Sequence, residues 1–176
     1  EKPNIDFYIK SDGEYAFVRL IKKLVEFNYD VKKFKDLNII LPNVCYVNDD
    51  KYIEGTYERV EDLSSIPSPY TMGLMDKFFE LKLMPTIQTN RGCPYECTFC
   101  ADGELSNRKI HRKSNEYMRE ELEYIAKKVK LSPTLAFCDL NFGMYKQDIE
   151  TAKIIRDIRR KYNWPDQMYG STGKSQ

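Results

Sequence analysis

The sequence predicts an α/β fold in which short parallel strands alternate with helices. Three segments in the second half of the chain are predicted as strands, at residues 85–89, 135–140 and 167–171. Two segments between them carry apolar residues at intervals of three and four, which is the spacing of an amphipathic helix. Strands and helices in this order predict a parallel sheet with right-handed crossovers.

One more strand and helix are predicted at the start of the chain. Residues 5–9 are rich in β-branched and aromatic side chains, which favours a buried strand. Residues 11–14 predict a turn and a helix start, and helical spacing continues over residues 15–27. The apolar residues with that spacing are Phe17, Leu20, Ile21, Leu24 and Val25.

The segment from residue 30 to residue 68 has no sustained periodicity. Residues 44–47 and 52–55 flank a polar turn and predict a small hairpin. Each proline at positions 67 and 69 disfavours a helical conformation for the residue before it. Residues 64–69 are therefore predicted to form a linker, with a domain boundary nearby.

Two helices separate the later strands. Ser114 is predicted to cap a helix that runs to about Val129, and a second helix over residues 147–162 ends before Pro165. We expect one face of each helix to point inward. The residues on these faces are Met118, Leu122, Ile125 and Val129 in the first helix, and Ile149, Ala152, Ile155 and Ile158 in the second.

The composition of the 176 residues fits a folded domain: 41% are hydrophobic and 31% charged. The net charge of +1 shows no basic excess, so nucleic acid is not an expected partner. No stretch reaches the roughly 20 apolar residues of a membrane span. Five cysteines without a secretion signal predict a cytoplasmic protein. Because the chain starts with Glu1 and enters a strand almost at once, we expect it to be part of a longer protein.

The most informative segment is the cysteine loop, residues 90–100, which follows the strand at 85–89. Cys93, Cys97 and Cys100 have the spacing Cys-x3-Cys-x2-Cys. Three thiolates within eight residues can surround one soft metal centre. An ordinary electron-transfer cluster has four thiolates, so three would leave one iron open for a cofactor or substrate.

Other readings of the cysteines stay open at this point. Cys45 or Cys138 could supply a fourth ligand to an iron–sulfur electron-transfer domain, although Cys138 is predicted as a buried strand residue. Zinc bound by the three cysteines and His111 would give a zinc-stabilised interaction module. However, His111 follows Cys100 by eleven residues, outside the usual ligand spacings. A disulfide with a spare thiol, or three unligated cysteines, are further alternatives.

The cysteine loop resembles that of the radical S-adenosylmethionine (radical SAM) superfamily. Phe99 provides the aromatic residue that the family places before its last cysteine. The resemblance implies a [4Fe–4S] cluster held by Cys93, Cys97 and Cys100, with S-adenosylmethionine on the fourth iron. Reductive cleavage of that cofactor would start radical chemistry, by methyl transfer, oxidation or rearrangement. It also implies an electron donor such as flavodoxin or ferredoxin and an unidentified, small-molecule substrate.

The resemblance also implies cofactor-binding residues outside the cysteines. Phe99 would pack near the adenine. The family commonly has Gly-Gly-Glu at the end of the second barrel strand, where it contacts the methionine amino group. This chain has Asp139-Leu140-Asn141 there, a departure from the pattern, so Asp139 or Asn141 would have to accept that hydrogen bond. Residues 171–174 would lie at the end of the third strand, without individual roles.

The order of elements before the cysteine loop resembles the subgroup with an N-terminal cobalamin-binding domain. The resemblance implies that residues 1–28 are the last βα unit of a Rossmann-like domain. Residues 29–82 would be a linker with a hairpin, and residues 83–176 the N-terminal half of a radical SAM barrel. The subgroup's histidine-containing cobalamin motif is absent, so this chain alone is not expected to bind cobalamin.

Half a barrel has consequences for the isolated chain. The family's barrel needs about six βα units, and only about three fit after Pro85. The open sheet would leave an unpaired edge and an apolar face, which predicts a dimer. We expect the chain alone to be inactive.

Overall fold

The computed structural model describes residues 5–173 and divides the chain into two compact units, Glu1–Val60 and Glu61–Gln176. The boundary lies close to the predicted proline linker. Within the first unit, the central hairpin packs with the first helix. Whether residues 1–28 close a Rossmann-like domain stays a prediction.

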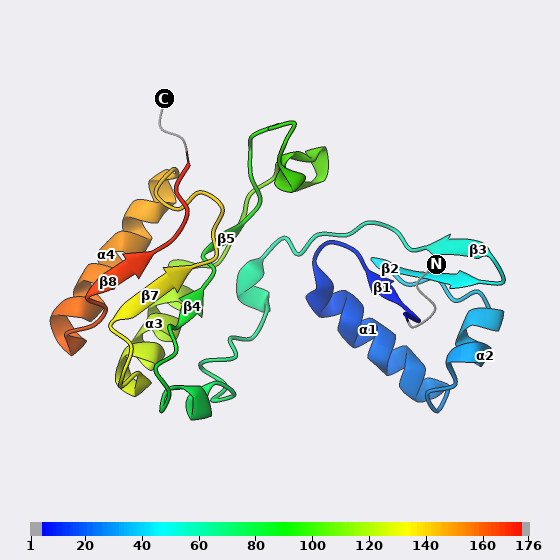
Figure 1. Cartoon of the computed structure of the whole chain (residues 1–176), viewed down its shortest axis with the longest axis horizontal. Coiled ribbons are helices and arrows are strands. Elements are labelled where there is room, and N and C mark those ends of the chain that lie inside the picture. Colours follow the sequence, from blue (N-terminus) through cyan, green and yellow to red (C-terminus); the bar gives the residue numbers. More distant parts are fainter. Residues whose placement is uncertain (1–4, 174–176) are drawn as a thin grey trace. The chain divides into compact units, whose positions relative to one another are not determined.

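The first unit is a three-stranded antiparallel sheet with two helices (Figure 1). The predicted hairpin is present and pairs with the first strand, which is shorter than predicted. The sheet order is β1-β2-β3, with Tyr8 opposite Cys45. The elements are β1 (Tyr8–Ile9), α1 (Gly13–Glu26), α2 (Val31–Asp36), β2 (Val44–Asn48) and β3 (Lys51–Glu54).

The short helix α2 was not predicted, because six residues carry too little periodicity. The side chain of Asp30 accepts a hydrogen bond from the backbone N–H of Lys33 at 2.9 Å and so caps the helix. Phe34 is fully buried, with its ring centre 5.1 Å from that of Phe7 and 5.7 Å from that of Tyr46. These edge-to-face contacts hold α2 on the sheet.

The second unit confirms the predicted alternation of parallel strands and helices. Its main sheet has the order β4-β7-β8, with both neighbouring pairs parallel. The helices α3 and α4 pack side by side and share one core with the strands (Figure 1). These elements are β4 (Thr86–Ile87), α3 (Asn115–Lys128), β7 (Thr134–Phe137), α4 (Lys146–Tyr162) and β8 (Gln167–Tyr169).

The inward face of α4 differs from the prediction. Ile149 and Ala152 are exposed, whereas Asp148, Thr151 and Ile154 are buried. The buried face of α4 is thus rotated about the helix axis from the predicted face. The Asp148 carboxylate is held inside because it accepts hydrogen bonds from the guanidinium of Arg112 and from two backbone N–H groups of the β7–α4 loop. The predicted inward residues Ile155 and Ile158 are buried, as are Met118, Leu122 and Ile125 of α3.

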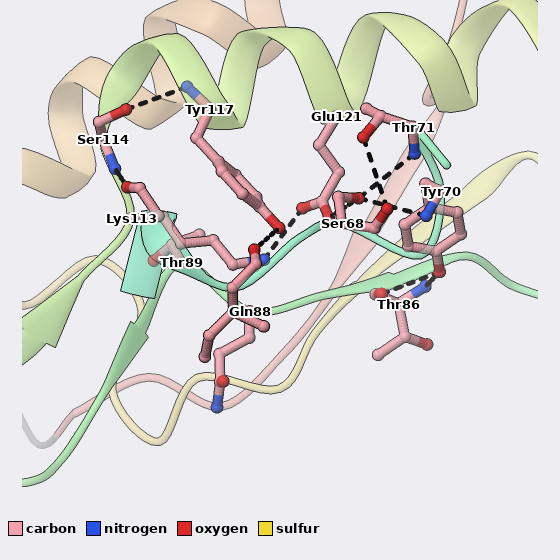
Figure 2. Close-up of polar contacts among 12 residues, drawn as sticks. Ser68, Tyr70, Thr71, Thr86, Gln88, Thr89, Lys113, Ser114, Tyr117 and Glu121 are labelled. Carbon is pink, nitrogen blue, oxygen red and sulfur yellow. Dashed lines mark hydrogen bonds and ion pairs between the residues drawn. The ribbon is translucent and has the colours of Figure 1, made fainter. Parts of the chain in front are cut away.

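The proline linker and Tyr70 after it are fastened to α3 and β4 by buried and partly buried polar contacts, drawn in Figure 2. The Ser68 hydroxyl donates to the Glu121 carboxylate at 2.6 Å, and the Lys113 ammonium lies 3.3 Å from the same carboxylate. The Tyr70 hydroxyl donates to the carbonyl of Thr86 at 2.9 Å and accepts from its N–H at 3.0 Å. These contacts join residues 16 and 53 positions apart in the sequence, and they fix the segment that enters the parallel sheet.

Two short strands that were not predicted form a hairpin at the base of the cysteine loop. They are β5 (Asn90–Arg91) and β6 (His111–Arg112), paired antiparallel. Short 3-10 turns complete the second unit at Leu63–Ser65, Asp76–Phe78, Ala101–Gly103 and Leu105–Asn107. Over residues 5–173, no helix has both the length and the apolar character needed to cross a membrane.

Candidate cofactor site

The carboxyl ends of three parallel strands meet at one edge of the main sheet. The chain leaves β4 toward the cysteine loop, and it leaves β7 through residues 138–145. The N–H of Phe142 donates to the carbonyl of Ser171, just after β8, at 3.0 Å. This edge is where α/β folds place ligand and catalytic residues.

The backbone of the cysteine loop packs closely on itself. The N–H of Cys93 donates to the carbonyl of Asn107 at 2.8 Å. Gly92 has φ +117°, and a Cβ there would lie 2.6 Å from the carbonyl oxygen of Lys109. A Cβ on Gly103 would lie 2.4 Å from the carbonyl oxygen of Cys97. Both positions therefore require glycine, and the loop cannot close this way with a larger residue.

All five cysteines are free thiols, which leaves no disulfide among them. Cys93 and Cys97 are half-buried, and Cys100 is exposed. Within residues 5–173, no three His, Cys, Asp or Glu side chains are close enough together to hold a metal ion, so the thiols share a loop without converging on one point. Cys45 is buried in the first unit. Cys138, predicted as buried, is exposed because β7 ends at Phe137.

Asp139 is 2% exposed and both of its carboxylate oxygens accept hydrogen bonds from protein groups. One oxygen accepts from the N–H of Thr89 at 2.7 Å and from the N–H of Asn90 at 3.4 Å. The other accepts from the Thr89 hydroxyl and, at 3.0 Å, from the Asn90 side-chain amide. Burial raises the pKa of Asp139, and these hydrogen bonds oppose the rise. The carboxylate therefore ties the end of β7 to the start of the cysteine loop.

Asn141 is 8% exposed and contacts the first cysteine of the motif. Its side-chain Nδ2 lies 3.2 Å from the Sγ of Cys93. Its Oδ1 lies on the side of Gly173, 3.3 Å from where a Cβ on that glycine would be. Two residues predicted separately, as a metal ligand and a cofactor contact, are thus neighbours. Phe99, the predicted adenine contact, is 82% exposed.

The sequence did not indicate a cluster of three polar side chains, Arg112, Tyr145 and Asp148, of which Tyr145 lies near Cys93. The Arg112 guanidinium lies 3.0 Å from the Asp148 carboxylate and stacks 4.4 Å from the centre of the Tyr145 ring. The Tyr145 hydroxyl is buried and has no hydrogen-bond partner within residues 5–173. Burial, and then the nearby Cys93, raise the pKa of Tyr145 to about 12. No spacing in the sequence indicated this group, because it joins residues 33 positions apart.

His111 does not join the cysteines. It is buried in β6, with its Nδ1 3.0 Å from the carbonyl oxygen of Glu61. The zinc arrangement considered from the sequence is therefore not formed in the part of the chain that the structure describes.

Comparisons with known proteins give a consistent group of relatives, although no family model matches the chain. A 2-(S-pantetheinyl)-carbapenam-3-carboxylate methyltransferase of Streptantibioticus cattleyicolor is 29% identical over 164 residues, which are 89% of this chain and 23% of that protein. The cobalamin-dependent radical SAM methyltransferase TokK of Streptomyces tokunonensis is 28% identical over 173 residues, 94% of this chain and 24% of TokK. The chain thus spans about a quarter of the length of these relatives.

Solved structures show the same fold. The cobalamin-dependent radical SAM enzyme OxsB, with aqua-cobalamin and S-adenosylmethionine bound, matches 88% of this chain and 20% of its own at 24% identity and a TM-score of 0.59. The radical SAM methyltransferase TsrM from Kitasatospora setae, with cobalamin and a [4Fe–4S] cluster bound, matches 92% of this chain and 31% of its own at 15% identity and a TM-score of 0.56. The chain is therefore similar in sequence to cobalamin-dependent radical SAM methyltransferases, in line with the resemblance of its cysteine loop to the superfamily and of its element order to the cobalamin-binding subgroup.

Proposed function

We propose that this chain is the cluster-binding part of a radical SAM enzyme, in which Cys93, Cys97 and Cys100 hold a [4Fe–4S] cluster. The observation that carries the proposal is the position of the cysteine loop. Three free thiols lie on one loop at the carboxyl edge of a parallel sheet. Curated relatives over 89% and 94% of the chain are methyltransferases by name.

The residues present fit such a cluster. Thiolates are the ligands that iron–sulfur clusters take. Cys100 is exposed and the other two are half-buried, so none of the three is locked in a core, and binding a cluster would have to bring their thiols together. The close backbone packing at Gly92 and Gly103 keeps the loop that carries the three cysteines compact.

Bound S-adenosylmethionine would supply a radical after reductive cleavage, and the chain's residues would orient it. Phe99 offers an exposed ring to the adenine. Of the two residues expected to accept from the methionine amino group, Asp139 already uses both oxygens within the protein. Asn141, whose amide nitrogen faces Cys93, still has a side-chain oxygen to accept with.

The names of the relatives favour methyl transfer over oxidation or rearrangement as the chemistry of the whole protein. That protein would act on a small molecule, take electrons from a flavodoxin or ferredoxin, and use cobalamin bound outside this chain. In this proposal residues 1–28 end the Rossmann-like domain and residues 83–176 are half of the barrel. All three residues of the edge strand β8 are exposed, as expected if β8 pairs with a further strand of the barrel or with a dimer partner.

Anaerobic reconstitution with iron and sulfide tests the proposal. We expect about four iron ions per chain, with visible absorbance from thiolate-bound iron. Cys97→Ala should lose this cluster. One equivalent of colourless zinc, with no iron retained, would support the zinc-stabilised module instead.

A further inference from the structure

We propose that Asn141 is a positioning residue for the cluster, which donates a hydrogen bond to the Cys93 ligand and thereby raises the reduction potential. The inference rests on the proposed function, because it assumes that Cys93 is a ligand. Its starting point is the 3.2 Å contact between Nδ2 of Asn141 and Sγ of Cys93.

The backbone that carries Asn141 is held in place by further contacts. This residue is nearly buried, and its carbonyl accepts from the N–H of Met144 at 3.3 Å. The next residue, Phe142, donates its N–H to Ser171 and stacks its ring 4.1 Å from the centre of the Phe137 ring. The backbone that carries the amide is therefore held by β7 and by the segment after β8.

The position of Cys93 is equally determined. Its N–H is bonded to Asn107 across the loop, and Gly92 before it has the positive φ that brings the two backbones together. Asn141 and Cys93 are 48 residues apart in the sequence. The contact therefore depends on the tertiary fold, and it joins the β7–α4 loop to the cysteine loop.

Ligation fixes the direction of this hydrogen bond. A thiolate that binds iron has no proton and can only accept. The amide nitrogen of Asn141 donates, so the nitrogen must face Cys93 once the cluster is bound. This leaves the amide oxygen on the opposite side, toward Gly173.

A donor at this place affects the reduced cluster more than the oxidised one. Reduction adds negative charge that spreads onto the sulfur ligands, and hydrogen bonds to those sulfurs stabilise it. The low exposure of Asn141 limits screening by water. Removing the donor should therefore lower the reduction potential without removing a ligand.

The test compares reconstituted variants by potentiometric titration, followed by electron paramagnetic resonance of the reduced cluster. Asn141→Leu keeps a similar volume without a donor, and Asn141→Asp keeps the shape but places a carboxylate beside the sulfur. The matched control is Gln147→Leu, an amide exposed on the first turn of α4.

In Asn141→Leu, we expect about a tenfold lower ratio of reduced to oxidised cluster at a fixed potential, which is a shift of about 59 mV for one electron. Asn141→Asp should shift further in the same direction, and Gln147→Leu should match the unmodified chain. The inference is overturned if either Asn141 variant holds a full cluster at an unchanged potential. It is also overturned if both fold but bind no iron, since Asn141 would then serve assembly. Failure of the unmodified chain to bind a cluster would refute the proposed function itself.

Discussion

The carboxylate of Asp139, just after β7, accepts a hydrogen bond from the backbone N–H of Thr89 at 2.7 Å. Thr89 stands between β4 and the cysteine loop, so one buried side chain connects two neighbouring strand ends. A negative charge is tolerated there because four protein donors surround it. The cysteine loop thus starts from a point that the sheet itself defines.

Replacing Asp139 by alanine should destabilise the second unit. The substitution leaves buried donors of Thr89 and Asn90 without an acceptor, and we expect a loss of about 2–3 kcal/mol in the free energy of unfolding. Urea denaturation would measure it. Asp166→Asn, which changes a largely exposed carboxylate, is the control and should be close to neutral. Equal stability of the Asp139 variant would show that these hydrogen bonds are not formed in solution.

The stability of the second unit should depend on Lys113 only while Glu121 is present, because the Glu121 side chain is buried, with 2% of its surface exposed. Lys113→Met leaves a buried carboxylate unpaired and should cost about 3–5 kcal/mol in urea unfolding. Adding Glu121→Leu should recover most of that loss. Lys130→Met removes an exposed pair with Glu80 and should change little. Additive losses in the double variant would contradict the coupling.

Acid should weaken the contact between α3 and α4 at Glu123. Hydrogen bonds from Lys161 and Tyr162 lower the pKa of Glu123 from 4.5 to about 2. A lowered pKa in the folded state stabilises the protein above pH 4.5, and this contribution is lost as the pH falls toward 2. Glu123→Gln should flatten that part of a pH–stability profile, and an identical profile in the variant would refute the assignment.

Cluster ligation should separate the cysteines into two classes. Cys93→Ala, Cys97→Ala and Cys100→Ala should each abolish a stable cluster after anaerobic reconstitution, because each removes one of only three thiolates. Cys45→Ala and Cys138→Ala should retain iron and sulfide at the level of the unmodified chain. If Cys45→Ala loses the cluster equally, the ligand assignment is wrong.

Features with local signals could be predicted from the sequence. Ser114 caps α3 as expected, with its hydroxyl accepting from the N–H of Tyr117 at 3.1 Å. The alternation of strands and helices after Pro85 was also predicted, because apolar spacing reports it directly. The cysteine motif was readable for the same reason, since its three cysteines lie within one loop.

Features set by distant residues could not be predicted. The rotation of α4 depends on Arg112, which reaches Asp148 from β6. The different roles of Asp139 and Asn141 also depend on distant residues. The sequence placed both at a strand end. Only the fold shows that Asp139 accepts a hydrogen bond from Thr89 and that Asn141 faces Cys93. Such contacts join segments 36 to 50 residues apart and leave no periodic pattern.

The most direct test of the central claim is electron paramagnetic resonance of the reduced, reconstituted chain with and without S-adenosylmethionine. An iron without a protein ligand can bind the cofactor, so we expect the cluster signal to shift when S-adenosylmethionine is added. A cluster signal that the cofactor leaves unchanged would contradict an open iron on this chain and favour an electron-transfer role.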